Sequence, residues 1–273
     1  MVLQFSLKMN SLQINKISKL HNGKNIFFCK TDFIEKTFTH IQDIKNEVIL
    51  ISGNSDYCVD DNLVKKAPKN IKRWFCQNRL SDNDLLESIP IGIENTIACS
   101  IDGHGYVWPH AIEKPSIINR LKNEDKQSRV NLIYSNFNVN TNPSHRNKVK
   151  EHISKLDHIT KDECNLNYQD FVKGVLSHEA VLCPQGNGEG DNHRIYETLH
   201  LGKVPITFNY KQFKYLHHKF PVVLINDLNE LNEEHKIKEK IDNAKKQMNF
   251  KLLDENYWIN RIKDETEKCN TTR

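Results

Sequence analysis

Short apolar runs of strand length alternate along this chain with stretches of helical periodicity. In the first half, the predicted strands are residues 24–30, 47–53, 71–77 and 89–93, and residues 32–42 form a predicted helix between the first two. Strands that alternate with helices are typical of a parallel sheet covered by helices. The pattern therefore predicts an α/β unit with a parallel sheet in the first half of the chain.

The second half of the chain repeats this layout. Its predicted strands are residues 130–137, 180–183, 204–208 and 221–225, and its predicted helices are residues 144–156, 168–179 and 228–249. Between about residues 114 and 129 the sequence is polar and charged and has no strand pattern, so we expect the domain boundary there. This divides the chain into residues 1–125, residues 126–250 and a final helix in residues 251–273. The final helix either crosses back to the first domain, with Trp258 as its anchor, or packs only on the second.

The segment from residue 180 to residue 207 combines a glycine-rich loop with the start of a helix. An apolar run at 180–183 is followed by the loop, a helical pattern from about Asp191, a turn at Gly202 and a second apolar run. Glycines let the backbone approach a ligand, and the first turn of a helix offers unpaired N–H groups and the positive end of the helix dipole. We therefore expect this loop to bind a phosphate group. Its expected contacts are Gly186, Asn187, Gly188, Gly190 and Asn192.

Three charged residues extend this predicted phosphate site. Arg194 and Glu197 are three residues apart and share one face of the predicted helix. Arg194 is expected to hold a diphosphate, and Glu197 to accept hydrogen bonds from the hydroxyls of a sugar. Arg146 lies in the first turn of a helix that follows a strand of the same predicted sheet, so it is a candidate for a second phosphate contact. In the alternative interpretation, Arg194 and Glu197 form a solvated ion pair and Asp191 is an ordinary helix cap. Arg146 would then lie on an exposed basic face.

At this point the sequence resembles a known family. The order Pro-x-Gly, then Arg-x-x-Glu on a helix, then Gly-x-x-Pro-Ile is similar to the donor-sugar half of the exostosin-like glycosyltransferases. The residues that match are Pro184, Gly186, Arg194, Tyr196, Glu197, Leu199, Gly202, Val204 and Pro205, with a looser continuation at Val222, Val223, Leu224 and Ile225. The chain departs from the family at Lys203, where members often carry Cys or Ala.

The resemblance implies the GT-B architecture, in which two Rossmann-like domains with parallel sheets flanked by helices face each other. It implies a glycosyltransferase that moves a sugar from a nucleotide diphosphate donor to a saccharide hydroxyl. The implied mechanism is inverting and independent of metal, because Arg194 and the helix start would stabilise the departing diphosphate in place of a cation. No cofactor is then expected, and the expected partners are the nucleotide sugar and the saccharide acceptor.

The first half of the chain holds candidates for the catalytic base and for acceptor binding. Asp56 and Glu94 each follow a predicted strand, at the edge of a parallel sheet where α/β folds place ligands. Either carboxylate could deprotonate an acceptor hydroxyl, or each could be an ordinary loop residue. The candidates for acceptor binding are Asn78, which also follows a strand, and His104 and Trp108, which lie in a loop rich in glycine and aromatic residues. That loop could instead serve only packing, or carry a metal-binding histidine pair.

Asp82 and Asp84 form an Asp-x-Asp pair, the metal-binding motif of the other glycosyltransferase architecture, GT-A. In that architecture the pair should follow a buried strand directly, whereas polar residues intervene here. Leu85 and Leu86 continue as in a helix, so we interpret Asp82 as a helix cap. The sequence therefore predicts no metal site.

The composition allows a sizeable core and requires no polyanionic partner. The chain has 273 residues, of which 37% are hydrophobic, and its net charge is +4 with 27% charged residues. Such a surface does not require nucleic-acid binding, although it would attract an anionic donor. The seven cysteines are scattered without a Cys-x-x-Cys pair, and no segment resembles a signal peptide or a membrane span. We therefore expect a soluble, cytoplasmic protein.

Two other classes of function stay open. A sulfotransferase or kinase would also use a phosphate-binding loop, but the chain lacks the Gly-x-x-x-x-Gly-Lys-Ser/Thr motif. A non-catalytic protein that binds nucleotide sugars or glycans would keep Gly186, Arg194 and Glu197 and lack a base in the first domain.

Overall fold

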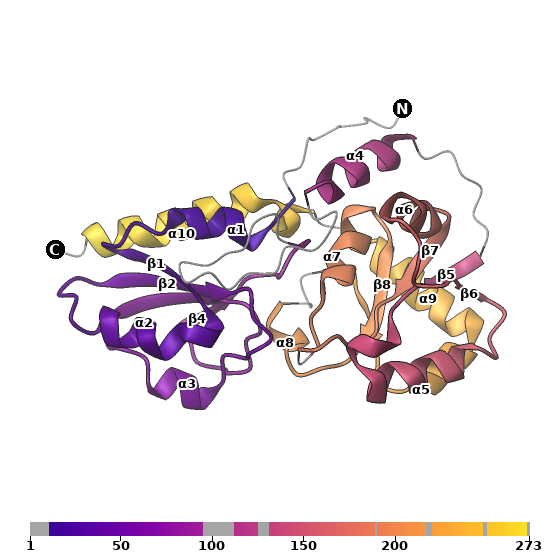
Figure 1. Ribbon diagram of the computed structural model, residues 1–273, viewed down its shortest axis with the longest axis horizontal. Helices are drawn as coiled ribbons and strands as arrows, with labels where there is room; N and C mark the ends of the chain where they lie inside the picture. Colours follow the sequence, from indigo (N-terminus) through magenta and orange to yellow (C-terminus); the bar gives the residue numbers. More distant parts are fainter. Residues whose placement is uncertain are drawn as a thin grey trace.

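The computed structural model describes residues 11–94, 112–124, 131–188, 190–216, 220–247 and 250–271, which build two parallel sheets. The first sheet has the strand order β1-β2-β3-β4 and the second has the order β6-β5-β7-β8-β9. Every pairing between these strands is parallel. Figure 1 shows the sheets in two neighbouring lobes, each flanked by helices. The predicted fold class, α/β with two parallel sheets flanked by helices, is confirmed.

The first sheet consists of short apolar strands: β1 (Ile26–Lys30), β2 (Val48–Gly53), β3 (Ile71–Cys76) and β4 (Leu86–Ser88). On one face lie η2 (Thr31–Phe33), α2 (Ile34–Ile41) and α3 (Asp61–Lys65). Helix α2 buries Ile34, Phe38 and Ile41, whose spacing of four and three residues puts them on one side of the helix. They share a core with Val48 and Leu50 of β2. All of β2 is buried because helices cover both faces of the sheet.

The last helix of the chain covers the other face of the first sheet. Here α1 (Ile14–Ile17) and η1 (Ser18–Leu20) lie beside α10 (Glu255–Thr271), which follows η6 (Lys251–Leu253) and packs against β2 and β3. Trp258 and Ile262 of α10 are buried in one core with Ile49 and Ile51. The chain therefore crosses back from the second sheet to the first, with Trp258 buried at the crossing.

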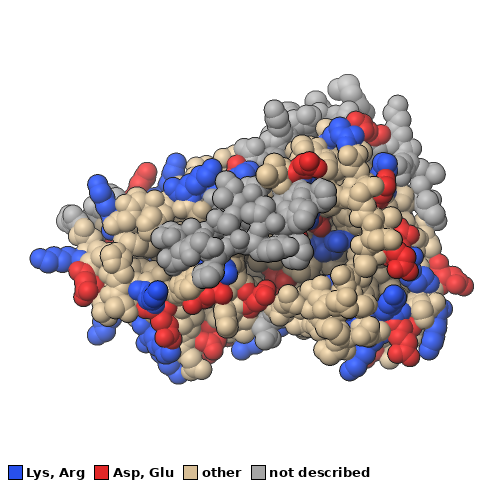
Figure 2. All heavy atoms as spheres, viewed as in Figure 1, with Lys and Arg blue, Asp and Glu red and all other residues tan. Residues whose placement is uncertain are grey.

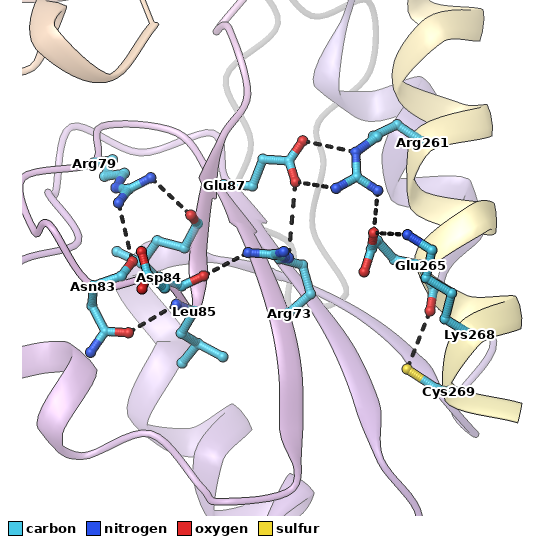
Figure 3. A network of polar contacts seen from close by, with 11 residues as sticks. Arg73, Arg79, Asn83, Asp84, Leu85, Glu87, Arg261, Glu265, Lys268 and Cys269 are labelled. Carbon is cyan, nitrogen blue, oxygen red and sulfur yellow. Dashed lines mark hydrogen bonds and ion pairs between the residues drawn. The ribbon is translucent and has the colours of Figure 1, made fainter. Parts of the chain in front are cut away.

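Ion pairs fasten α10 to strand β4, as Figure 3 shows. The Arg261 guanidinium makes a fork on Glu87, with Nε 3.1 Å from Oε1 and Nη2 2.8 Å from Oε2. Arg261 also donates to Glu265, which accepts a second bond from Lys268 Nζ at 2.8 Å. Burial opposes ionisation of Glu265, but the bonds from Lys268 and Arg261 outweigh it and lower the pKa of this carboxyl to about 2. The network holds the last helix on the first sheet.

The second sheet is flanked by helices on both sides. Its strands are β5 (Asn131–Ser135), β6 (Ile159–Lys161), β7 (His178–Leu182), β8 (Val204–Phe208) and β9 (Val223–Ile225). Its helices are α4 (Lys114–Glu124), α5 (Pro143–Ile153), α6 (Tyr168–Leu176), α7 (His193–His200), α8 (Phe213–Leu216) and α9 (Glu234–Lys245), with 3-10 turns at η3 (Val139–Thr141) and η5 (Leu228–Asn232). Helix α4 packs against α6, so the segment in which we expected the domain boundary contains a helix.

The carboxyl ends of the two sheets face each other. The loops that follow β2, β3 and β4 contact the loops that follow β7 and β8. The contacts are Gln212 Nε2 to Cys58 Sγ at 3.5 Å, Lys214 Nζ to Asp82 Oδ1 at 2.7 Å and His193 Nδ1 to Gly92 O at 2.8 Å. Loops at the carboxyl edge of a parallel sheet are where open α/β folds bind ligands. The fold therefore brings together the carboxyl edges of both sheets, the edges at which α/β folds bind ligands.

Two predictions for the first unit are wrong. Residues 89–93 are not a strand; the fourth strand is Leu86–Ser88, and Pro90, which has no N–H for a sheet ladder, lies just beyond it. Residues 82 and 83 have no regular structure, residues 84 and 85 form a turn, and strand β4 follows, so Asp82 is not a helix cap. Asp82 pairs with Lys214 instead.

In the second unit, the predicted helix 228–249 is divided into η5 and α9. The division lies at Glu233, whose backbone leaves the helical region with φ −99° and ψ 82°. Strand β6 was not predicted, because three residues are too few to show a period. Among the helices of the described ranges, none has the length and apolar content that crossing a bilayer requires.

Candidate functional site

The described residues of the loop between β7 and α7 contact one another and also Asn142 and Tyr210. Gly190 has a φ of 148°, and a Cβ there would lie 2.7 Å from the Cβ of Tyr210. The Gly186 carbonyl accepts a hydrogen bond from Asn142 Nδ2 at 3.0 Å, and Gln185 Nε2 donates to Gly188 O at 2.8 Å. The loop therefore requires glycine at position 190, because a side chain would be strained and would meet Tyr210.

Helix α7 begins beside this loop without a side-chain cap. Asn192 occupies the cap position in an extended conformation, but its side chain makes no capping hydrogen bond. Its Oδ1 is buried and has no hydrogen-bond partner among the described residues. Asp191 is not the cap; its two oxygens accept bonds from the Asn192 amide and the Tyr196 hydroxyl. The start of α7 thus presents backbone N–H groups that lack helical partners, a favourable place for an anion.

Arg146 and Arg194 lie close together beside the loop. The Arg146 guanidinium donates to three backbone carbonyls, from Nε to Gln185 at 2.7 Å, from Nη1 to Asn138 at 2.7 Å and from Nη2 to Pro184 at 3.3 Å. Within the described ranges, no carboxylate neutralises this guanidinium. Burial and the neighbouring charge of Arg194 lower the pKa of Arg146 to about 10. Two mutually repelling cations at a loop of this kind indicate a site for an anion.

Arg194 is held in place from three directions. Its Nη1 donates to Asn136 O at 3.0 Å, its Nε lies 3.2 Å from Glu197 Oε2, and its Cζ lies 3.8 Å from the centre of the Phe171 ring. The arginine side chain is 29% exposed, whereas the Glu197 side chain is 3% exposed. The alternative interpretation of a solvated ion pair is therefore wrong, because its carboxylate is buried.

Glu197 is the centre of a buried ionic network that joins the two units. Its Oε1 accepts hydrogen bonds from Lys114 Nζ at 2.7 Å and from the Tyr168 hydroxyl at 3.3 Å. Lys114 also donates to Glu94 of the first unit. Burial opposes ionisation of Glu197, but Lys114 and Arg194 outweigh it and hold the pKa of Glu197 below its ordinary value. Burial likewise opposes the charge on Lys114, yet Glu197 and Glu94 raise the pKa of this ammonium.

Asp56 lies across from the glycine loop. A Cβ on Gly188 would be 3.8 Å from Asp56 O and 3.9 Å from Asp56 Oδ1. Asp56 is exposed and forms no ion pair with the described residues. Asn78 supports this loop, since its Nδ2 donates to Ser55 O at 2.7 Å. The Asn78 amide thus contacts the backbone next to Asp56 and holds the carboxylate opposite the second unit.

The structure brings most of the predicted site residues to the facing sheet edges. Those in the glycine loop and beside it are Gly186, Asn187, Gly188, Gly190, Asn192, Arg194, Glu197 and Arg146, and those on the first unit are Asp56, Asn78 and Glu94. Asn187 is exposed in the loop. The predicted acceptor residues His104 and Trp108 lie outside the described residues. The roles of all these residues as base, donor ligand or acceptor ligand stay predictions.

Sequence reasoning missed the partners that orient these side chains. Lys114 lies in the segment in which we expected the domain boundary, and Tyr168 and Asn136 were assigned no function. One available signal was electrostatic, because the carboxylates of Glu94 and Glu197 need a cation when they are buried. Nothing in the spacing identified Lys114 as that cation.

In the part of the chain that the structure describes, the charged side chains do not indicate a metal site or a strongly acidic or basic binding surface. Among the described residues there is no group of three or more His, Cys, Asp or Glu side chains placed to hold a metal ion. The Asp82 side chain is 75% exposed and pairs with Lys214. Figure 2 shows acidic and basic side chains interspersed over the face in view.

Comparison with known proteins gives likenesses to solved structures alone. No family model matches the sequence, and no curated protein matches it. Among solved structures, the chain is similar to an α1,3-fucosyltransferase, with 13% sequence identity and a TM-score of 0.42. The likeness covers 76% of this chain and 66% of the fucosyltransferase chain, slightly less than two thirds of the latter. Similarity at this level does not define a family.

Proposed function

We propose that this protein is a glycosyltransferase that moves a sugar from a nucleotide diphosphate donor to a saccharide hydroxyl, with inversion and without a metal. The observation that supports the proposal is the pair Arg146 and Arg194 beside the glycine loop and the start of α7. A diphosphate would bring negative charge to Arg146, which has no carboxylate partner among the described residues, and to Arg194, which shares Glu197 with Lys114. Planar guanidinium groups suit phosphate oxygens. The exostosin-like resemblance of the same segment is the reason to propose a sugar as the group transferred.

In the proposed function, donor binding replaces the contact between Arg194 and Glu197. Glu197 already accepts bonds from Lys114, Tyr168 and Arg194. Arg194 is the more exposed of its two cationic partners, at 29% against 11% for Lys114. We propose that Arg194 turns from Glu197 to the diphosphate, and that a ribose hydroxyl of the donor takes its place on the carboxylate.

The proposed reaction uses Asp56 as the base. The acceptor hydroxyl oxygen forms a bond to the anomeric carbon of the donor sugar, while the bond from that carbon to the phosphate oxygen breaks. The hydroxyl proton passes to Asp56, and the nucleoside diphosphate leaves with the electron pair of the broken bond. Arg146, Arg194 and the loop N–H groups stabilise the departing charge. Glu94 is less suited than Asp56, because its carboxylate is already bound to Lys114.

A thermal-shift experiment with a panel of nucleotide sugars, with and without EDTA, tests the proposal. The melting temperature should rise with at least one nucleotide diphosphate sugar, and the rise should survive EDTA. It should disappear in Arg194→Ala and in Arg146→Ala. Arg120→Ala is the matched control, because Arg120 is exposed on α4 and forms a surface pair with Glu124.

The other outcomes separate the alternatives. If no nucleotide sugar raises the melting temperature, the proposal is contradicted. A shift that requires Mn²⁺ would contradict metal independence. Donor binding without transfer to water or to any acceptor would favour a non-catalytic nucleotide-sugar-binding protein.

A further inference from the structure

The first unit contains a pocket that none of the functional assignments above uses. It lies at the carboxyl ends of the adjacent parallel strands β1 and β2, and its volume is about 620 Å³. Residues 30–35 line it on one side, and the loop after β2 with helix α3 lines it on the other. The volume falls within the range of about 300–1,000 Å³ that small-molecule sites occupy. The position and size therefore suit a ligand of a few rings at most.

The pocket opens next to the proposed reaction centre. Tyr57 and Cys58 line it and directly follow Asp56, which faces Gly188 of the second unit. Cys58 Sγ accepts a bond from Gln212 Nε2, and Gln212 Oε1 accepts one from the Asp191 amide at the end of the glycine loop. A molecule in the pocket would therefore lie one residue away from the candidate base and across from the proposed donor loop.

The lining of the pocket has the chemistry of a neutral polyhydroxyl ligand. Charges of both signs are paired around it, with Lys30 Nζ 3.5 Å from Asp32 Oδ2 and Lys66 Nζ 2.6 Å from Glu35 Oε1. Asp60 also lines the pocket, where its carboxylate accepts a bond from the Leu63 amide, so the lining does not favour an anion. Hydroxyl groups can donate to these carboxylates and accept from the ammonium groups. The ring of Tyr57, which is 66% exposed, offers an apolar face of the kind that covers a sugar ring.

An unsatisfied polar group in the wall also indicates a ligand. Thr31 lines the pocket and is 4% exposed, and its Oγ1 is buried without a hydrogen-bond partner among the described residues. Buried hydroxyl groups in folded proteins nearly always have a partner, so an unpaired one requires an explanation. Because this oxygen is itself buried, a ligand hydroxyl that enters the pocket would supply the partner only by shifting the wall around Thr31.

We propose that this pocket binds a neutral saccharide and that this saccharide is the acceptor of the transfer. The role of this saccharide as the acceptor rests on the proposed function. The binding of a neutral saccharide by the pocket does not depend on the donor site. Its sugar ring lies against Tyr57, and the hydroxyl that reacts extends past Tyr57 to the Asp56 carboxylate.

The test is saturation-transfer NMR on the full chain, without donor, using glucose, galactose, mannose, N-acetylglucosamine and their β-linked disaccharides as probes. At least one neutral sugar should bind the wild-type protein. Its dissociation constant should rise about tenfold in Tyr57→Ala and stay unchanged in Tyr57→Phe, which keeps the ring. Thr31→Val should weaken binding, whereas Thr31→Ser, which keeps a hydroxyl, should not.

Several results would overturn the inference. They are the absence of binding by every neutral sugar, equal binding by the wild type and Tyr57→Ala, and tighter binding of glucuronic acid or glucose 6-phosphate than of glucose. The nucleotide-sugar thermal shift is measured on the same samples. If a neutral sugar binds through Tyr57 but no nucleotide sugar binds, the saccharide site stands and the proposed transfer fails. If nucleotide sugars bind and no neutral sugar does, the pocket inference fails and the donor site stands.

Discussion

Lys114 Nζ donates a hydrogen bond to Glu197 Oε1 at 2.7 Å, although the two residues are 83 positions apart in the sequence. The same ammonium donates to Glu94 at the carboxyl edge of the first sheet. Because both partners are mostly buried, neither charge can be left alone without a large cost in solvation. The lysine therefore links the helix that carries Arg194 to the first unit.

Removal of this link should destabilise the fold. Lys114→Met leaves two carboxylates without their cation, and the free energy of unfolding should fall by about 3–5 kcal/mol, as is usual for breaking a buried ion pair. Urea unfolding at pH 7 measures the change. Lys173→Met is the control, because Lys173 and Asp170 are both close to half exposed and their pair should contribute less than about 1 kcal/mol. Equal losses of unfolding free energy in the two variants would show that the Lys114 network stabilises the fold no more than a surface ion pair does.

A buried histidine should make stability depend on pH in the mildly acidic range. Burial, and next the charge of Lys122, lower the pKa of His200 to about 3, and its Nε2 has no hydrogen-bond partner among the described residues. The unfolded chain binds a proton at this residue below about pH 6.5 while the folded chain does not, so stability is present above that pH and is lost on acidification toward pH 3. The contribution to the slope is at most about 1.4 kcal/mol per pH unit.

Urea unfolding at pH 7 and at pH 4.5 checks this prediction. His200→Gln should reduce the loss of stability between these two values. His235→Gln, at an exposed position, should leave the loss unchanged. If His200→Gln retains the full wild-type dependence on pH, the histidine is not the group responsible.

The sequence predicted the glycine loop and α7 because their signals are local. Glycines, the two flanking apolar runs and the Arg-x-x-Glu spacing all lie within residues 180–207. The partner of Glu197 was not predictable in this way, since Lys114 reaches it only through the packing of α4 against α6. The strand predicted at 89–93 is a false positive. The alternation of Ile89, Ile91 and Ile93 resembles a strand, but Pro90 has no N–H to donate to a neighbouring strand. At this segment the deciding feature is local, the missing N–H of Pro90, whereas Lys114 is identified only by long-range packing.

Two glycines of the loop should differ sharply in their tolerance of alanine. Gly190→Ala places a methyl group 2.7 Å from Tyr210 at a φ of 148°, a strain of about 1–3 kcal/mol that the loop can relieve only by moving. Gly188→Ala meets nothing closer than 3.8 Å. The nucleotide-sugar thermal shift should therefore shrink in Gly190→Ala and persist in Gly188→Ala. The reverse order would mean that the loop does not bind the donor in the described conformation.

The assignment of the base can be decided by comparing two carboxylates. Asp56→Asn should lower the rate of transfer, and of slow donor hydrolysis in which water replaces the acceptor, by about a hundredfold or more, because the group that accepts the proton is lost. Donor binding, measured by thermal shift, should be unchanged, since Asp56 lies on the opposite unit from Arg146 and Arg194. Glu94→Gln should act mainly on stability, because it removes one of the two carboxylates bound to Lys114. A folded Glu94→Gln protein that has lost catalysis, beside an active Asp56→Asn protein, would assign the base to Glu94 and leave Asp56 as a residue of the acceptor side.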